Sequence, residues 1–168
     1  MDAGLKRELE AKVYAGERLT REDGDALFAS DDLAWLGRLA HHRRTRLFGD
    51  RVTFGTVPQE WADPVSGTPA PAELLKIFAV SRLTLADDVR LTCRWDVYGL
   101  PAAQLALNFG ADDLAAAELP EDRGELVELI WDAGFQPAER DDRYQVVREY
   151  EKPTPLAERR SEPQKIWA

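Results

Sequence analysis

The stretch that decides the fold is Val89-Arg90-Leu91-Thr92-Cys93-Arg94-Trp95. Apolar and polar residues alternate strictly along it, which is typical of a β-strand with one buried and one polar face. The alternation places Cys93 on the apolar face. We therefore expect a half-buried strand over residues 89–95, with Cys93 as a small core residue.

Helical and strand patterns alternate on both sides of this stretch. Pro71 suits the first turn of one helix, and Pro101 suits the first turn of another that ends at Gly110. The elements expected in this block are helices over 72–85, 101–109 and 121–133, and strands over 89–95, 113–117 and 144–148. Helices that alternate with strands favour an α/β fold with parallel strand pairing.

A proline-rich segment precedes this block and divides the chain. Residues 55–71 hold four prolines and two glycines, which indicates a linker. The expected divisions are an N-terminal helical segment with a first strand (1–54), the linker (55–71), a C-terminal α/β part (72–150) and a polar tail (151–168).

The N-terminal segment carries start and stop signals for three helices. Gly16 is placed to end the first helix, and Thr20 with Asp23 forms a capping-box pattern for the second. Ser30 is expected to cap the third, whose leucines recur at helical spacing.

The charge of the chain is acidic overall but unevenly distributed. The formal net charge is −9, and residues 108–142 hold eleven acids against two arginines. Because phosphate contacts dominate nucleic-acid affinity, we expect no nucleic-acid partner. Residues 38–51 show the opposite bias, with five arginines beside His41 and His42. This cluster suits either a small anion or a solvated last helical turn.

The cysteine count and hydropathy exclude several classes of protein. Cys93 is the only cysteine of the chain, so the sequence predicts neither an internal disulfide nor a cysteine-based metal site. No apolar run reaches 18 residues, so no membrane span is expected. The first residues lack the pattern of a signal peptide, which predicts a cytoplasmic protein.

Several runs of the chain together match the pattern of one enzyme family. The N-terminal runs are Ser30–Gly37, Leu39–Ala40 and Gly49–Val52. The C-terminal runs are Lys76–Leu83, Gln104–Asp113, Glu139–Asp141, Val146–Tyr150 and Leu156–Ala168. In these runs the chain resembles the aminofutalosine synthases, which implies a radical SAM enzyme of menaquinone biosynthesis. Such an enzyme has a (β/α) barrel, a [4Fe-4S] cluster and S-adenosylmethionine, and transfers an adenosyl group to a chorismate-derived enol ether.

The resemblance is interrupted where the family carries its cluster loop. After Phe54 the chain runs directly into Gly55-Thr56-Val57-Pro58, without the family's Cys-x-x-x-Cys-x-x-Cys motif. A complete eight-stranded barrel also needs roughly 200 residues, more than this chain has. We therefore expect an incomplete (β/α) barrel that binds no cofactor and performs no adenosyl transfer alone.

The resemblance also suggests site residues. It implies substrate binding by Ser81, Arg82, Asp112 and Asp113. Read without the family, the two aspartates belong to a turn and helix end, and Ser81 and Arg82 have surface and packing roles. The run Glu139–Asp141 is expected to form a local ion network.

Three hypotheses about function follow. The chain is a catalytically incompetent synthase-like protein, a non-enzymatic partner-binding module, or one half of a two-chain synthase. A cut barrel exposes strand edges, which favours oligomers of this chain or pairing with a full-length homologue.

Overall fold

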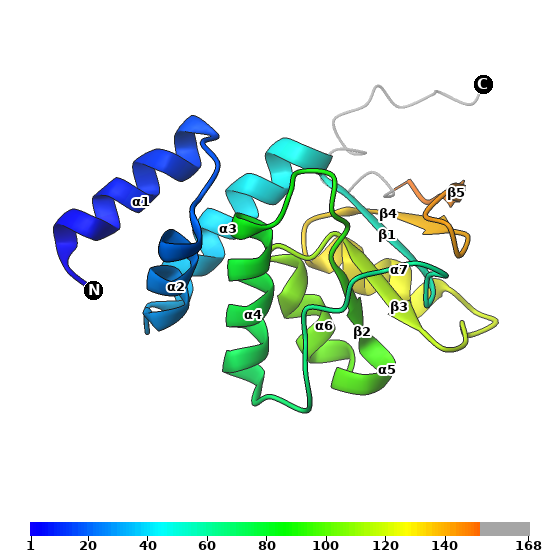
Figure 1. Ribbon diagram of the computed structural model, residues 1–168. Helices are drawn as coiled ribbons and strands as arrows, with labels where there is room; N and C mark the ends of the chain where they lie inside the picture. Colours follow the sequence, from blue (N-terminus) through cyan, green and yellow to red (C-terminus); the bar gives the residue numbers. More distant parts are fainter. Residues whose placement is uncertain (152–168) are drawn as a thin grey trace, which may run out of the picture.

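The computed structural model describes residues 1–151 and shows helices gathered against one mixed sheet (Figure 1). The helices are α1 (Ala3–Ala15), α2 (Arg21–Ala29), α3 (Leu33–Phe48), α4 (Pro71–Thr84), α5 (Trp95–Tyr98), α6 (Leu100–Leu107) and α7 (Gly124–Asp132). The strands are β1 (Arg51–Thr56), β2 (Thr92–Arg94), β3 (Asp113–Ala116), β4 (Gln136–Arg140) and β5 (Val146–Glu149). The run Leu156–Ala168, and all of the expected tail beyond Glu151, lie outside the described residues.

The strands form one sheet in the order β2-β3-β1-β4-β5. The pairs β2–β3, β3–β1 and β1–β4 are parallel, and β5 pairs antiparallel with β4. Parallel pairing, expected from the alternation of helices and strands, is thus confirmed for three of the four pairs. Strand β1 lies at the centre of the sheet, between β3 and β4. The segments before and after residues 55–71 therefore contribute strands to the same sheet. The fold is of the mixed α/β class.

The two faces of the sheet differ in chemistry. Val52, Phe54, Cys93 and Leu114 are fully buried and belong to a core with side chains of α4, α6 and α7. A second core lies between α1, α2, α3 and α4, and Figure 1 shows α1 and α2 at the end of the molecule away from the sheet. The apolar face therefore carries the hydrophobic stabilisation of the sheet.

The opposite face is polar at its centre. Register places Thr53 of β1, Asp113 of β3 and Thr92 of β2 in one row across three neighbouring strands. Each of these three side chains is at most 3% exposed. A buried polar row needs hydrogen-bond partners, and those partners define the site described below.

Local signals in the sequence account for many of the element ends. Gly16 ends α1 in the left-handed conformation, Thr20 and Asp23 form the expected capping box, and Pro71 is the first residue of α4. One capping prediction was wrong, because Asp32 caps α3 by accepting the N–H of Trp35. The hydroxyl of Ser30 instead accepts the N–H of Asp32.

The strand expected over residues 89–95 is shorter than its alternation indicated. Strand β2 covers only Thr92–Arg94, and Trp95 begins the short helix α5. The carbonyl of Val89 accepts from the Arg82 side chain and the N–H of Leu91 donates to Asp112. Side chains thus bind these two main-chain groups, although the Leu91 carbonyl still accepts the main-chain N–H groups of Asp112 and Asp113.

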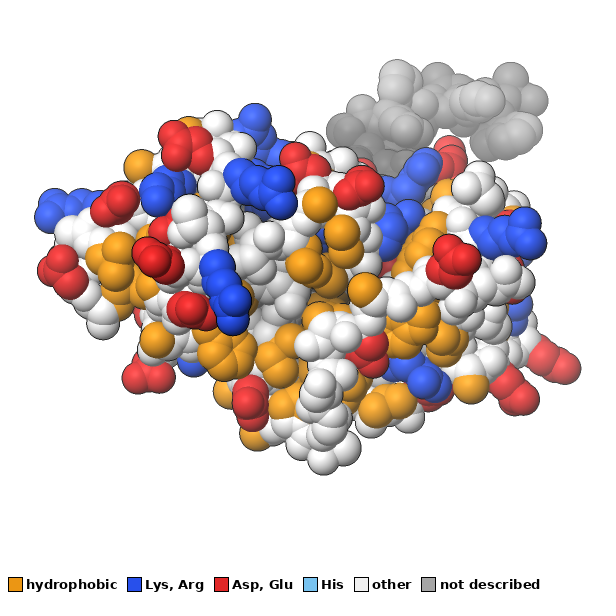
Figure 2. All heavy atoms as spheres, viewed as in Figure 1, with side chains coloured by type: hydrophobic (Ala, Val, Ile, Leu, Met, Phe, Trp, Pro, Cys, Tyr) orange, Lys and Arg blue, Asp and Glu red, His pale blue; other side chains and the backbone are white. Residues whose placement is uncertain are grey.

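No helix of residues 1–151 has both the length and the apolar character needed to cross a membrane. On the face drawn in Figure 2, acidic and basic side chains are interspersed with hydrophobic ones rather than gathered by sign.

Candidate functional site

The polar face of the sheet is organised around Asp113, at the start of β3. Its carboxylate accepts a bidentate pair of hydrogen bonds from Arg140, at 2.5 Å from Nε and 2.7 Å from Nη2. The hydroxyls of Thr53 and Thr92 donate to it at 2.6 and 2.7 Å. The side chains of Asp113 and Arg140 are both fully buried. Burial raises the pKa of Asp113, and Arg140 acts in the opposite sense.

The neighbouring Asp112 holds two further arginines. Its Oδ1 accepts from Nη2 of Arg82 at 2.6 Å, and its Oδ2 accepts from Nε of Arg90. Arg82 also donates to the carbonyls of Gly110 and Val89 at 2.8 and 2.9 Å. Every nitrogen of the Arg82 guanidinium therefore has a partner.

Tyr144 covers this network from the loop between β4 and β5. It has a positive φ of 62° and is the single non-glycine residue of 1–151 with such a backbone. A left-handed tyrosine is strained by about 1–2 kcal/mol. Its hydroxyl lies 2.8 Å from the Thr92 hydroxyl, and its ring stacks against Arg90 and Arg140 at 4.7 and 4.8 Å. These contacts offset the strain.

The structure brings together three of the four residues suggested for substrate binding. Arg82, Asp112 and Asp113 all belong to the network just described, whereas Ser81 takes no part in those bonds. Asp112 lies in the turn between α6 and β3, Asp113 is the first residue of β3, and both are buried and ion-paired.

The run Glu139–Asp141 does not form the expected local network. Arg140 turns to Asp113 on β3, and Glu139 accepts from Arg123 of the segment before α7 at 2.8 Å. The carboxylate of Asp141 accepts main-chain N–H groups of its own turn. The reason is the alternation of β4, which sends successive side chains to opposite faces.

The arginine and histidine cluster of α3 is not simply a solvated helical turn. Arg44 is fully buried and donates to the carbonyls of Ala111, Gly49 and Arg51. The His41 ring lies 5.8 Å from the Phe135 ring, and burial lowers the pKa of His41. Arg44 thus holds the chain around the end of α3 and the starts of β1 and β3.

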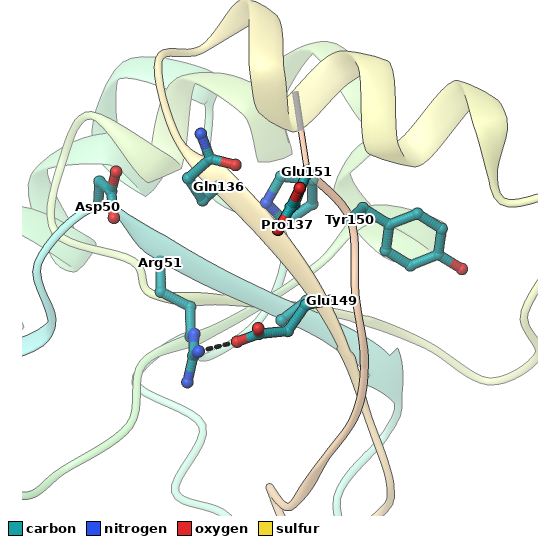
Figure 3. Close-up of a pocket in the computed structure, with 8 residues that line it drawn as sticks. Asp50, Arg51, Gln136, Pro137, Glu149, Tyr150 and Glu151 are labelled. Atoms are coloured by element: carbon teal, nitrogen blue, oxygen red, sulfur yellow. Dashed lines mark hydrogen bonds and ion pairs between the residues drawn. The ribbon is translucent and has the colours of Figure 1, made fainter. Parts of the chain in front are cut away.

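Two cavities flank the start of β1. One, of about 230 Å³, is lined by Arg51, Thr53, Arg90 and Asp112 together with apolar side chains. The other, of about 220 Å³, lies between the starts of β1 and β4 and the end of β5 (Figure 3). Arg51 borders both, and Figure 3 shows its guanidinium meeting the carboxylate of Glu149.

The hydrogen bonds within the Asp113 row occupy its polar atoms, which limits the reactions that these side chains could catalyse. The carboxylate accepts four hydrogen bonds, and the Arg140 guanidinium also donates to the carbonyls of Thr56 and Asp141. A carboxylate held in this way has no lone pair directed at a substrate. The arrangement suits structural stabilisation better than acid–base chemistry.

Gly55 makes room for Arg140, and we expect Gly55→Ala to destabilise the fold by about 1–3 kcal/mol. A β-carbon there would lie 2.7 Å from Nη1 of Arg140 and 2.8 Å from the Arg140 carbonyl oxygen, which is main chain and cannot move aside easily. Urea unfolding measures the change. Gly4→Ala is the control, because the nearest atom there is a flexible carboxylate. Equal stability of the two variants would contradict the prediction.

Two curated proteins of Streptomyces coelicolor are similar to this chain. Aminodeoxyfutalosine synthase is 76% identical over 54 residues, which are 32% of this chain and 14% of that protein. Cyclic dehypoxanthine futalosine synthase is 31% identical over 101 residues, which are 52% of this chain and 25% of that protein. The chain thus matches no more than a quarter of the length of either relative. A scan against models of known protein families finds no match.

The residues of this chain do not fit the [4Fe-4S] cluster that the resemblance implies. A cluster held in the usual way needs thiolates, and the chain has one cysteine, which is fully buried. Burial raises the pKa of Cys93 to about 12. The thiol is therefore kept protonated within the apolar core, as expected from its alternating strand.

Cys93 is accordingly expected to resist modification in the folded protein. At pH 8 a pKa of about 12 rather than 9 lowers the thiolate fraction about a thousandfold, and burial blocks access as well. A coloured disulfide reagent should label less than a tenth of the protein within an hour in native buffer. The same protein in 6 M guanidinium, which exposes the thiol, should be labelled completely. Rapid labelling of the folded protein would contradict the position of Cys93 in the hydrophobic core.

Proposed function

We propose that this chain is a futalosine synthase-like protein of menaquinone biosynthesis that does not carry out adenosyl transfer by itself. The proposal rests on the combination of high sequence identity to a synthase with a cysteine count too low for its cluster. A chain 76% identical to aminodeoxyfutalosine synthase over 54 residues holds a single, buried cysteine. Ligand count therefore argues against the cluster on which radical SAM chemistry depends.

The polar face of the sheet supports the same proposal. If the strands descend from an incomplete (β/α) barrel, this face corresponds to the inside of the barrel. On this face the Arg140 guanidinium already donates to Asp113 and to the carbonyl of Thr56, and the Tyr144 side chain packs over them. The chain's own side chains therefore fill this part of the inner face, at the level where β2 and β3 begin.

A complementation experiment tests the proposal. A menaquinone auxotroph that lacks its synthase should not grow when it expresses this chain, whereas the full-length Streptomyces coelicolor synthase should restore growth. Anaerobic treatment of the purified chain with iron and sulfide should give no cluster absorption. Near-ultraviolet circular dichroism shows whether the chain is folded in each case. Growth, or a stable cluster on the chain alone, would overturn the proposal.

A second candidate function is that of a partner-binding module, or of one half of a two-chain synthase. Strand β5 lies at the edge of the sheet, and Val146 and Val147 on it are 39% and 60% exposed. An exposed apolar edge strand is a template for pairing with another chain. Co-purification with a full-length homologue would favour this candidate, and a clean monomer in light scattering without co-purification would count against it.

A further inference from the structure

We infer that the cavity of about 230 Å³ on the polar face binds a small oxyanion, a carboxylate or a phosphate, between Arg51 and Arg90. The cavity draws on three parts of the chain that are distant in sequence. The end of α3 and the start of β1 supply Phe48, Arg51 and Thr53, the segment before β2 supplies Arg90, and the loop before β5 supplies Tyr144.

Arg90 is held in place before any ligand arrives. Its Nε donates to Asp112, and its Nη2 donates to the Thr53 hydroxyl at 2.6 Å. The guanidinium lies between the rings of Tyr144 and Phe48, at 4.7 and 5.5 Å. These contacts leave the Nη1 edge for a ligand, and a planar guanidinium matches the geometry of carboxylate and phosphate oxygens.

The charge balance around the cavity favours an anion. Asp112 is the acid that lines it, but this carboxylate is 1% exposed and already shared by Arg82 and Arg90. In the network that adjoins the cavity, the three arginines Arg82, Arg90 and Arg140 are all at least three-quarters buried, and they face two buried acids, Asp112 and Asp113. The excess of positive charge therefore persists although the chain is acidic overall.

Arg51 is the more exposed of the two arginines that line the cavity. Its side chain is 50% exposed and meets Glu149, which is 58% exposed. Exposed ion pairs contribute little to stability, so the exchange of Glu149 for the oxygen of a ligand costs little. The cavity shown in Figure 3 also borders Arg51, but Asp50, Glu149 and Glu151 line it and would repel an anion.

The size of the cavity limits the ligand. About 230 Å³ lies below the range of roughly 300–1,000 Å³ that is usual for drug-sized ligands. Inorganic phosphate or a short carboxylic acid fits this limit, whereas a nucleotide exceeds it. Phe48 and Val146 supply apolar wall for the body of a carboxylic acid.

Titrations with inorganic phosphate and with butyrate, each at constant ionic strength, test the inference. The arginine Nε–H resonances in nitrogen-15 spectra of the full chain report on Arg51 and Arg90 separately. We expect saturable shifts of both resonances, with dissociation constants in the millimolar range. The probe that binds more tightly identifies the source of the oxyanion, because butyrate also contacts the apolar wall.

Two variants of exposed residues separate binding from folding. Arg51→Gln should weaken binding about tenfold, whereas Glu149→Gln should tighten it about threefold by releasing Arg51. Arg94→Gln is the control, because Arg94 pairs with Asp96 elsewhere on the surface. The absence of saturable shifts with both probes would overturn the inference. Equal weakening by Arg51→Gln and Arg94→Gln would also overturn it, since it would reflect only the overall charge.

Discussion

Arg140→Met is expected to lower the free energy of unfolding by about 3–5 kcal/mol, because it leaves the buried Asp113 carboxylate without its counter-charge. Both side chains are fully buried, and the two bonds between them are 2.5 and 2.7 Å long. Since whole domains are stable by only about 5–15 kcal/mol, the loss should shift the urea midpoint strongly. Near-ultraviolet circular dichroism during urea unfolding measures it.

A double-variant cycle measures the coupling free energy between Asp113 and Arg140 separately from any general effect of the substitutions on packing. Asp113→Asn removes the charge and keeps one acceptor oxygen, so one of the two threonine hydroxyls, Thr53 or Thr92, keeps its acceptor while the other meets the amide NH2. The double variant Asp113→Asn with Arg140→Met should be more stable than the two separate losses predict, by about 1–3 kcal/mol. Arg123, which pairs with Glu139 at a partly exposed site, provides the control, and Arg123→Met should cost about 1 kcal/mol or less. Additive losses in the cycle would show that the pair is not coupled.

Sequence patterns could identify part of this site but not its arrangement. The resemblance singled out Arg82, Asp112 and Asp113, and the structure joins them in one buried network. Arg140 was expected to pair within its own run, because local spacing cannot show that β4 sends it across the sheet to β3. The partners are 27 residues apart along the chain, and only the register of three strands brings them together.

The secondary structure likewise divides into elements with local sequence signals, which could be predicted, and elements set by non-local pairing, which could not. Helix signals such as Thr20 with Asp23 act over three residues, and the sequence therefore predicts them well. Strand β4 was missed because Gln136-Pro137-Ala138-Glu139-Arg140 carries neither an apolar run nor a simple alternation. Its pairing is set by the parallel register with β1, where Pro137 lies beside Val52. Non-local pairing of this kind leaves little trace in a short window of sequence.

Arg44→Met is expected to destabilise the fold by a comparable amount, about 3–5 kcal/mol, although Arg44 has no carboxylate among its hydrogen-bond partners. Its guanidinium donates to three main-chain carbonyls, those of Ala111, Gly49 and Arg51, and stacks on the Phe135 ring at 4.2 Å. Burial lowers its pKa to about 10, which still leaves it charged at neutral pH. Removal would therefore leave buried carbonyls without the donor that joins α3, β1 and the turn before β3.

Arg46→Met, two positions further along the same helix, is the matched control. Arg46 donates to the carbonyl of Tyr14 at 3.2 Å from an exposed position, so its loss should change the free energy of unfolding by less than about 1 kcal/mol. Arg44→Lys should recover only part of the stability, because an ammonium cannot span three carbonyls as a planar guanidinium does. If Arg44→Met and Arg46→Met unfolded at the same urea concentration, Arg44 could not be the link between the helical segment and the sheet. A large difference would mean that one arginine of the basic cluster holds the two parts of the chain together.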